Sequence, residues 1–200
     1  MSLEGKKIVF ELSDKNFESE LDEDTPQDIF MDLLFDVQSG GSELEKLLSE
    51  GILKVKCSSE LLSDSFDSYS LEYVEEVLNL FIHLDEECLV RGVSFEDEKE
   101  YSKRMNAVEK TGRDKMRSLM SQEEIQSLKS QRVNPEHAIW ATKNYRKAWG
   151  YTERSSVPRR VLLFYDKNEL KQPASVEKPY LFVSENPQEA LKAVVVFKYS

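Results

Sequence analysis

The sequence is poor in the residues that build disulfide scaffolds, metal sites and phosphate-binding loops. Two cysteines, Cys57 and Cys88, exclude a small disulfide-rich secreted scaffold. Together with His83 and His137 they match no zinc-binding spacing, so no metal site is predicted. Gly40-Gly41 lacks the lysine and the strand–helix context of a phosphate-binding loop, and no Gly-x-Ser-x-Gly elbow occurs.

Long apolar runs are also missing. No stretch approaches the roughly 20 apolar residues that cross a bilayer. The first six residues, Met-Ser-Leu-Glu-Gly-Lys, lack the residue order of a signal peptide. The sequence therefore predicts a cytoplasmic chain with no membrane partner. Its 200 residues, 40% of them hydrophobic, are enough for one core without cross-links.

Charge is unevenly distributed along the chain. The net charge is −11, with −19 in residues 1–100 and +8 in residues 101–200. This asymmetry predicts either two functional faces or acidic helices that solvate one side of a single domain. The acidic half favours a basic protein partner, whereas the basic half favours phosphate or nucleic acid. A basic run over 103–117 has few aromatic residues, so an exposed helix face explains it at least as well as RNA binding.

The spacing of apolar residues predicts the α+β class. Residues 1–85 are expected to form an acidic, mainly helical region with a short strand over 6–12 and with helices beginning at Thr25-Pro26 and spanning 71–83. Residues 86–200 are expected to be β-rich. Ser121-x-x-Glu124 is a capping box expected to open a short helix, and Thr142 is expected to cap a helix over 143–151.

The helical region is expected to pack on a mixed or antiparallel sheet as one compact unit. The strongest expected strands, which should share that sheet, are 88–93, 137–141, 159–166 and 193–199. The residues expected in the core are Leu33, Phe81, Leu162 and Phe164.

Arg91 lies within an apolar, strand-like run and directly before Gly92. An unpaired buried guanidinium is very costly, so Arg91 is expected either to line a cleft or to point to water from an edge strand. In the first case Gly92 lets backbone or ligand approach closely, and in the second it marks a bulge.

Three segments resemble, in chain order, the motifs of the Arg-Ser-Glu class of ADP-ribosyltransferases. The segment 89–93 (LVRGV) is similar to the first motif, a strand bearing Arg-Gly. The segment 139–149 resembles the second, where a strand ends in a hydroxyl residue and leads into a helix. The segment 184–194 resembles the third, which bears a glutamate before the closing strand.

The resemblance covers residues 86–199, and in length and in Leu-x-Arg-Gly-Val it extends to small phage enzymes that ADP-ribosylate host proteins. Pro187 stands two residues before Glu189, where arginine-modifying members carry Glu or Gln.

The resemblance implies NAD as cofactor and a macromolecular target, in an active enzyme or an inactive relative. It implies that Arg91, with Gly92 beside it, holds the NAD pyrophosphate. Thr142 braces the nicotinamide ribose, and Glu189 or Glu185 stabilises the oxocarbenium ion that forms as nicotinamide leaves.

The resemblance also implies an aromatic side chain, Trp149 or Tyr151, that stacks on nicotinamide. The alternative function is a non-enzymatic acidic interaction protein that docks on a basic partner or mimics nucleic-acid charge. The two functions differ in whether Arg91 and Glu189 or Glu185 share one pocket.

Overall fold

The computed structural model describes residues 6–12, 42–51, 53–58, 71–84, 86–114, 120–173 and 179–199. The helix expected at Thr25-Pro26 and the core residue Leu33 lie outside the described residues. The strands are β1 (Lys6–Leu12), β2 (Leu53–Ser58), β3 (Cys88–Val93), β4 (Ala138–Trp140), β5 (Arg159–Asp166), β6 (Leu181–Val183) and β7 (Leu191–Tyr199). The α-helices are α2 (Ser42–Ser49), α3 (Leu71–Ile82), α4 (Glu98–Thr111), α5 (Gln122–Ser130), α6 (Tyr145–Thr152) and α7 (Pro187–Ala190).

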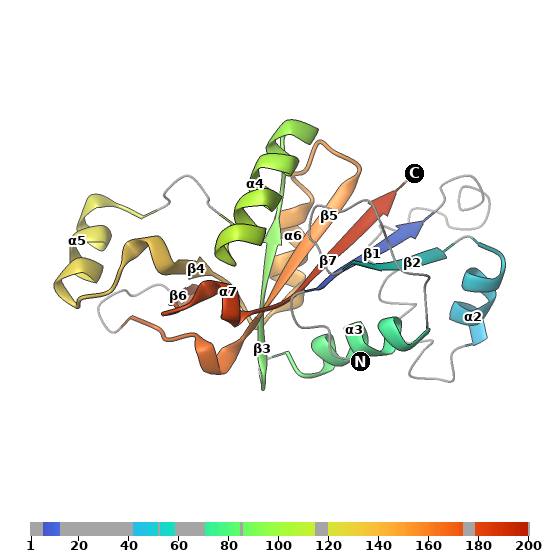
Figure 1. The fold of residues 1–200 in the computed structure, drawn as a ribbon, viewed down its shortest axis with the longest axis horizontal. Coiled ribbons are helices and arrows are strands. Elements are labelled where there is room, and N and C mark those ends of the chain that lie inside the picture. The colour runs from blue at the N-terminus through green and yellow to red at the C-terminus, as the bar shows by residue number, and fades with distance from the viewer. Residues whose placement is uncertain are drawn as a thin grey trace.

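Five strands form one twisted sheet in the order β2-β1-β7-β5-β3 (Figure 1). The β1–β7 pair is parallel and the other three pairs are antiparallel, so the sheet is mixed and the predicted α+β class is confirmed. β1 and β2 come from the acidic region before residue 86, and β1 lies between β2 and β7. The sheet therefore takes strands from both sides of the predicted boundary at residues 85 and 86.

The prediction that residues 137–141 join the main sheet is wrong. β4 pairs with β6 in a separate two-stranded sheet, which lies with α5 at one end of the molecule (Figure 1). The chain after β4 meets β3 at a single bridge, where the backbone N–H of Thr142 donates to Val90 and the backbone N–H of Val90 donates to Thr142, both at 2.8 Å. Apolar composition predicted the strand, but pairing depends on a partner some 40 residues away in sequence, which composition does not reveal.

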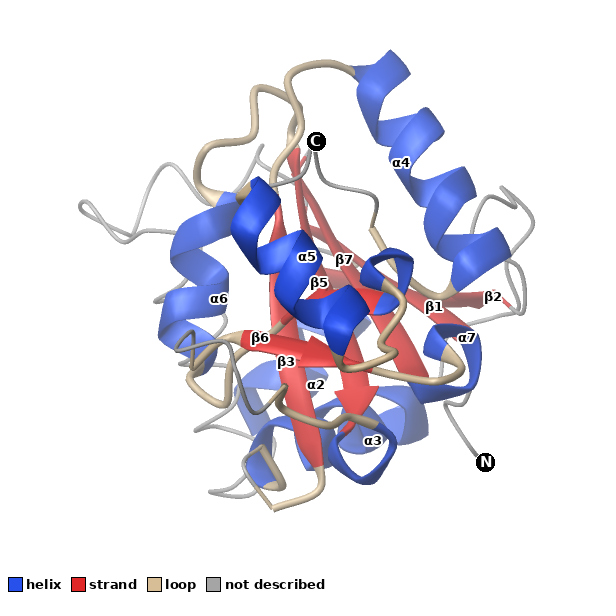
Figure 2. Ribbon diagram, turned by 90° about the vertical axis from the view of Figure 1, so that its left-hand side faces the viewer, coloured by secondary structure: helices blue, strands red, loops and turns tan. Residues whose placement is uncertain are grey.

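Two hydrophobic clusters cover opposite faces of the sheet, because successive side chains of a strand point to opposite faces. α3 and α6 cover one face and α4 covers the other (Figure 2). Leu162 and Phe164 are buried under α3 and α6, as predicted. Phe81, in the last turn of α3, is only partly buried, contrary to the prediction, and its ring meets Phe164 edge-on at 5.1 Å.

The structure confirms one predicted helix cap and corrects another. Ser121 and Glu124 form the reciprocal capping box expected from their spacing at the start of α5. The cap of α6 is Asn144 rather than the predicted Thr142, because the Asn144 side chain accepts from the backbone N–H of Lys147 at 3.2 Å. The Thr142 hydroxyl instead accepts from the N–H of Asn144 at 3.1 Å, which shapes the turn between β4 and α6.

Gly92 permits the close approach of α6 to β3. A Cβ atom at this position would lie 1.7 Å from the carbonyl oxygen of Ala148, which is far inside van der Waals contact. Gly92 pairs with Leu162 in an unbroken register, so it marks no bulge.

We expect Gly92→Ala to lower the free energy of unfolding by about 1–3 kcal/mol or more, because α6 must move away from the sheet. Gly150→Ala is the matched control: a Cβ there meets nothing within 4 Å, and removing a helical glycine should add up to about 1 kcal/mol. Urea unfolding followed by circular dichroism measures both. Equal stability of the two variants would contradict this packing.

Leu162→Ala should lower the free energy of unfolding by about 2–5 kcal/mol, since Leu162 is 1% exposed in the central part of the sheet. Ile82→Ala, at a side chain that is 53% exposed, should change it by less than about 0.5 kcal/mol. Thermal unfolding by calorimetry compares the two. A near-zero shift for Leu162→Ala would show that β5 is peripheral.

Candidate functional site

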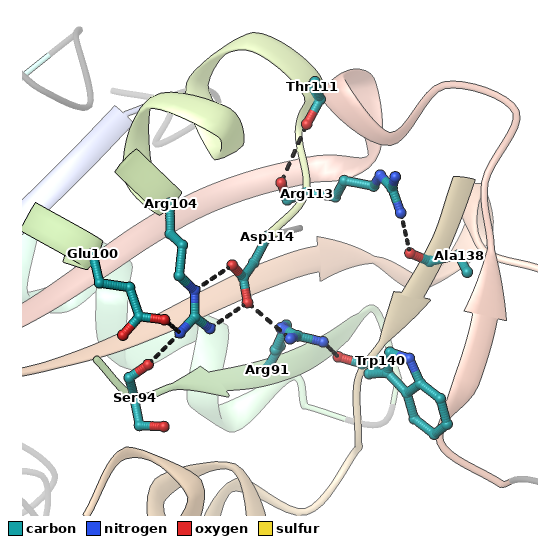
Figure 3. A network of polar contacts seen from close by, with 9 residues as sticks. All are labelled: Arg91, Ser94, Glu100, Arg104, Thr111, Arg113, Asp114, Ala138 and Trp140. Atoms are coloured by element: carbon teal, nitrogen blue, oxygen red, sulfur yellow. Dashed lines mark hydrogen bonds and ion pairs between the residues drawn. The ribbon is translucent and has the colours of Figure 1, made fainter. Parts of the chain in front are cut away.

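Arg91 is buried in an ion pair under α4. It lies opposite Leu163 in the β3–β5 register, which directs its side chain to the sheet face that α4 covers. The side chain is 6% exposed, Nη2 donates to Oδ2 of Asp114 at 2.8 Å, and Nη1 donates to the carbonyl oxygen of Trp140 at 3.2 Å (Figure 3). β3 is the last strand of its sheet, as the edge-strand reading expected, but Arg91 does not point to water.

Asp114 receives a second arginine from α4. Arg104 donates from Nε to Oδ1 at 2.8 Å and from Nη2 to Oδ2 at 2.7 Å, the two-point geometry that a planar guanidinium suits. Arg104 also contacts the carbonyl oxygen of Ser94 and, at 3.2 Å, the carboxylate of Glu100 (Figure 3). α4 ends at Gly112 in the left-handed conformation, with φ of 68°, which turns the chain so that Asp114 lies beside β3.

The Arg91–Asp114 cluster, meaning Arg91, Arg104, Asp114 and Glu100, combines two positive and two negative charges. The Asp114 side chain has no exposed surface. Burial alone would raise the pKa of its carboxyl group, but the hydrogen bonds and charges of Arg104 and Arg91 outweigh burial and hold the pKa below its ordinary value. The carboxylate is therefore ionised at neutral pH, and both guanidinium groups are held in fixed orientations.

Two buried donors in this region have no hydrogen-bond partner among the described residues: Nε of Arg91 and the hydroxyl of Tyr165. Burial raises the pKa of the Tyr165 hydroxyl far above its usual value, so this group is a neutral phenol. Buried donors are normally paired, so these two are potential contacts for an acceptor group.

The structure brings the backbone of Thr142 to β3 beside Arg91, but the side chains of Thr142 and Trp149 lie on the opposite face of the sheet, which Gly92 also faces. Thr142 is bridged to Val90, the residue before Arg91, and is itself buried. Gly92 faces α6 on the opposite side of the sheet. Trp149 is 2% exposed on that same side, with its ring edge-on to Phe197 at 4.9 Å.

The remaining predicted site residues lie at the surface. Tyr151 is 55% exposed on α6. Glu185 is exposed and its Oε1 lies 3.3 Å from Nζ of Lys171. Glu189 is exposed on α7, and no hydrogen bond or ion pair joins its carboxylate to the described residues. α7 packs on the end of α4, where the backbone of Pro187 and Gln188 would contact any Cβ at Gly112.

Arg104 and Asp114 are members of the site that sequence reasoning missed. Both lie in the basic run over 103–117, for which an exposed helix face and RNA binding were the two interpretations. Lys103 and Lys110 are indeed exposed, but Arg104 and Arg113 make ion pairs with Asp114 and Glu136 at 2.7 and 2.9 Å. The available signal was an aspartate within a basic run, two residues after a glycine that ends a helix.

Comparison with protein-family models, with curated proteins and with solved structures finds no match to this chain. Within the described ranges, no group of three or more His, Cys, Asp or Glu side chains is placed to hold a metal ion. In the same part of the chain, no helix combines the length and the apolar character needed to span a membrane.

Asp114→Asn should lower the free energy of unfolding by about 3–5 kcal/mol at neutral pH, because it leaves two guanidinium groups without their buried counter-charge. Glu136→Gln is the control: it breaks an ion pair whose carboxylate is 74% exposed, and should cost less than about 1 kcal/mol. Urea unfolding at neutral pH measures both losses.

The same loss should depend on pH. The native pKa of Asp114 lies below its unfolded value of about 3.9, so its contribution is complete above that pH and is lost as pH falls through the native pKa. The stability difference between wild type and Asp114→Asn should therefore shrink below about pH 4. A difference that stays constant down to about pH 2 would contradict an ionised, ion-paired Asp114.

Proposed function

We propose that the chain is an ADP-ribosyltransferase-like protein that uses NAD to modify a macromolecular target. The observation that supports it is that the end of the second motif's strand meets the strand of the first motif: Thr142 pairs with Val90, and Arg91 donates to the carbonyl oxygen of Trp140. These two segments are some 50 positions apart in sequence, and the resemblance requires them to meet in space.

Arg91 retains donors for a phosphate group. A guanidinium carries five N–H donors, and the cluster uses one from Nη1 and one from Nη2. Nε has no partner among the described residues. Asp114 would hold the planar group in one orientation, so that Arg91 binds pyrophosphate without first losing side-chain freedom.

Glu189 is the better candidate for the catalytic carboxylate. Glu185 has Lys171 as a counter-ion, whereas the Glu189 carboxylate has no partner among the described residues. NAD supplies the ADP-ribosyl group when bound. The role of Glu189 would be to stabilise positive charge on the ribose ring while nicotinamide leaves, which a free carboxylate does better than a neutralised one.

We expect isothermal titration calorimetry to detect NAD binding to the wild type. Arg91→Lys should weaken it about tenfold or more, because lysine keeps a charge for Asp114 but lacks the planar fork. Glu189→Gln, at an exposed position, should bind NAD as the wild type does and release nicotinamide about 100-fold more slowly or not at all. A folded wild type that shows no heat with millimolar NAD would refute the proposal.

The second candidate is a non-enzymatic interaction protein on the same fold. The observation that favours it is the ion pair between Arg91 and Asp114, in which the arginine side chain is only 6% exposed. In this case Arg91 is structural, and Arg91→Lys changes stability while NAD produces no heat with either protein. The calorimetric titration thus separates the two candidates.

A further inference from the structure

Exposed tyrosines and cations alternate along the outer side of α6 and the residues beside it. Tyr151 is 55% exposed and Tyr180, in the turn before β6, is 37% exposed. Lys147 and Arg154 are the cations next to them, and both are exposed. We call Tyr180, Lys147, Tyr151 and Arg154 the tyrosine–cation row.

Contacts join the four side chains in two pairs, and the spacing along α6 makes the two pairs neighbours. Nζ of Lys147 donates to the hydroxyl of Tyr180 at 2.6 Å and lies 5.0 Å from the centre of its ring. Lys147 and Tyr151 are four residues apart on α6, and hence neighbours on one helix face. The guanidinium of Arg154 lies 5.8 Å from the centre of the Tyr151 ring. The order along the surface is therefore Tyr180, Lys147, Tyr151, Arg154.

The segment 143–154, which carries three of the four residues of the row, is positively charged although the whole chain carries −11. Residues 143–154 contain four cations, Lys143, Arg146, Lys147 and Arg154, and one carboxylate, Glu153. All five side chains are exposed, and Oε1 of Glu153 lies 3.7 Å from Nη1 of Arg160. Surface potential depends on the nearest charges, because charges more than about 10 Å away are screened by salt.

We infer that the tyrosine–cation row binds single-stranded nucleic acid. Sequence-independent binding of single strands combines cations that contact phosphates with aromatic rings on which unpaired bases stack. The row supplies both in alternation, whereas the basic run over 103–117 has cations without exposed rings and two of its arginines are committed to ion pairs. An acidic protein partner would form ion pairs with the cations of the row but would not account for its two exposed tyrosines.

This inference is independent of the proposed transfer activity. The row lies on the α6 side of the sheet, and Arg91 lies under α4 on the other side. Binding of nucleic acid therefore needs neither NAD nor Arg91. Either proposal can fail without contradicting the other.

The test is fluorescence anisotropy of a labelled oligothymidylate with the full chain at about 50 mM salt. Wild type should bind, and log affinity should fall linearly with log salt. Tyr151→Ala should weaken binding about fivefold or more, the lower end of what one base stack contributes, while Tyr151→Phe should bind as the wild type does. Lys147→Ala should weaken binding and reduce the salt slope by about one.

Lys129→Ala, at an exposed lysine of α5, is the charge-matched control and should bind as the wild type does. Double-stranded DNA should compete poorly, because its bases are already stacked. Three results would overturn the inference: no anisotropy change in the wild type, equal binding by Tyr151→Ala and wild type, or equally strong competition by poly-glutamate. The last result would instead indicate a surface for acidic proteins.

Discussion

The burial of Asp114 between two guanidinium groups is the constraint on which the arrangement around β3 depends. Arg91 comes from the edge strand of the sheet, Arg104 from the middle of α4, and the carboxylate from the segment that follows α4. A buried carboxylate that loses one partner costs several kcal/mol, so these three segments are not free to move independently. The Arg91 contact to the carbonyl oxygen of Trp140 extends the same constraint to β4.

The two faces of β3, one covered by α4 and the other by α6, differ in chemistry. Arg91 and Gly92 are consecutive in β3, so their faces are opposite: the arginine meets Asp114 under α4, and the glycine meets the backbone of α6. The α4 side holds fixed, ion-paired charges, and Thr142 is bridged to Val90 at the edge of β3 with its side chain on the α6 side. The outer side of α6 holds exposed charges and rings. A dinucleotide bound at Arg91 and a single-stranded nucleic acid bound along α6 would thus lie on opposite faces of the sheet at β3.

Much of the fold was predictable because local patterns decide it. The alternating or continuous apolar runs of β1, β3 and β5 predicted those strands, and the Ser121–Glu124 spacing predicted the start of α5. Two of the predictions that failed concern features that local patterns do not decide, namely a helix cap for which neighbouring residues compete and a strand pairing between distant segments. Asn144 caps α6 in place of Thr142, since both side chains accept hydrogen bonds in the same turn. β4 pairs with β6 away from the main sheet, since strand pairing is a contact between distant segments.

The candidate site was also predictable from the sequence only in part. Sequence alone determined that Arg91 is exceptional, because a cation in an apolar strand is expected either to line a cleft or to point to water. Only the tertiary structure decided that Arg91 is buried against a counter-charge, supplied 23 residues later by Asp114. Likewise the sequence determined the cations and tyrosines of α6, while tertiary packing decided which rings are covered: Trp149 is buried against Phe197, and Tyr151 remains exposed. The physical reason is that residue type and local spacing are written along the chain, whereas burial and charge pairing arise only when distant segments meet.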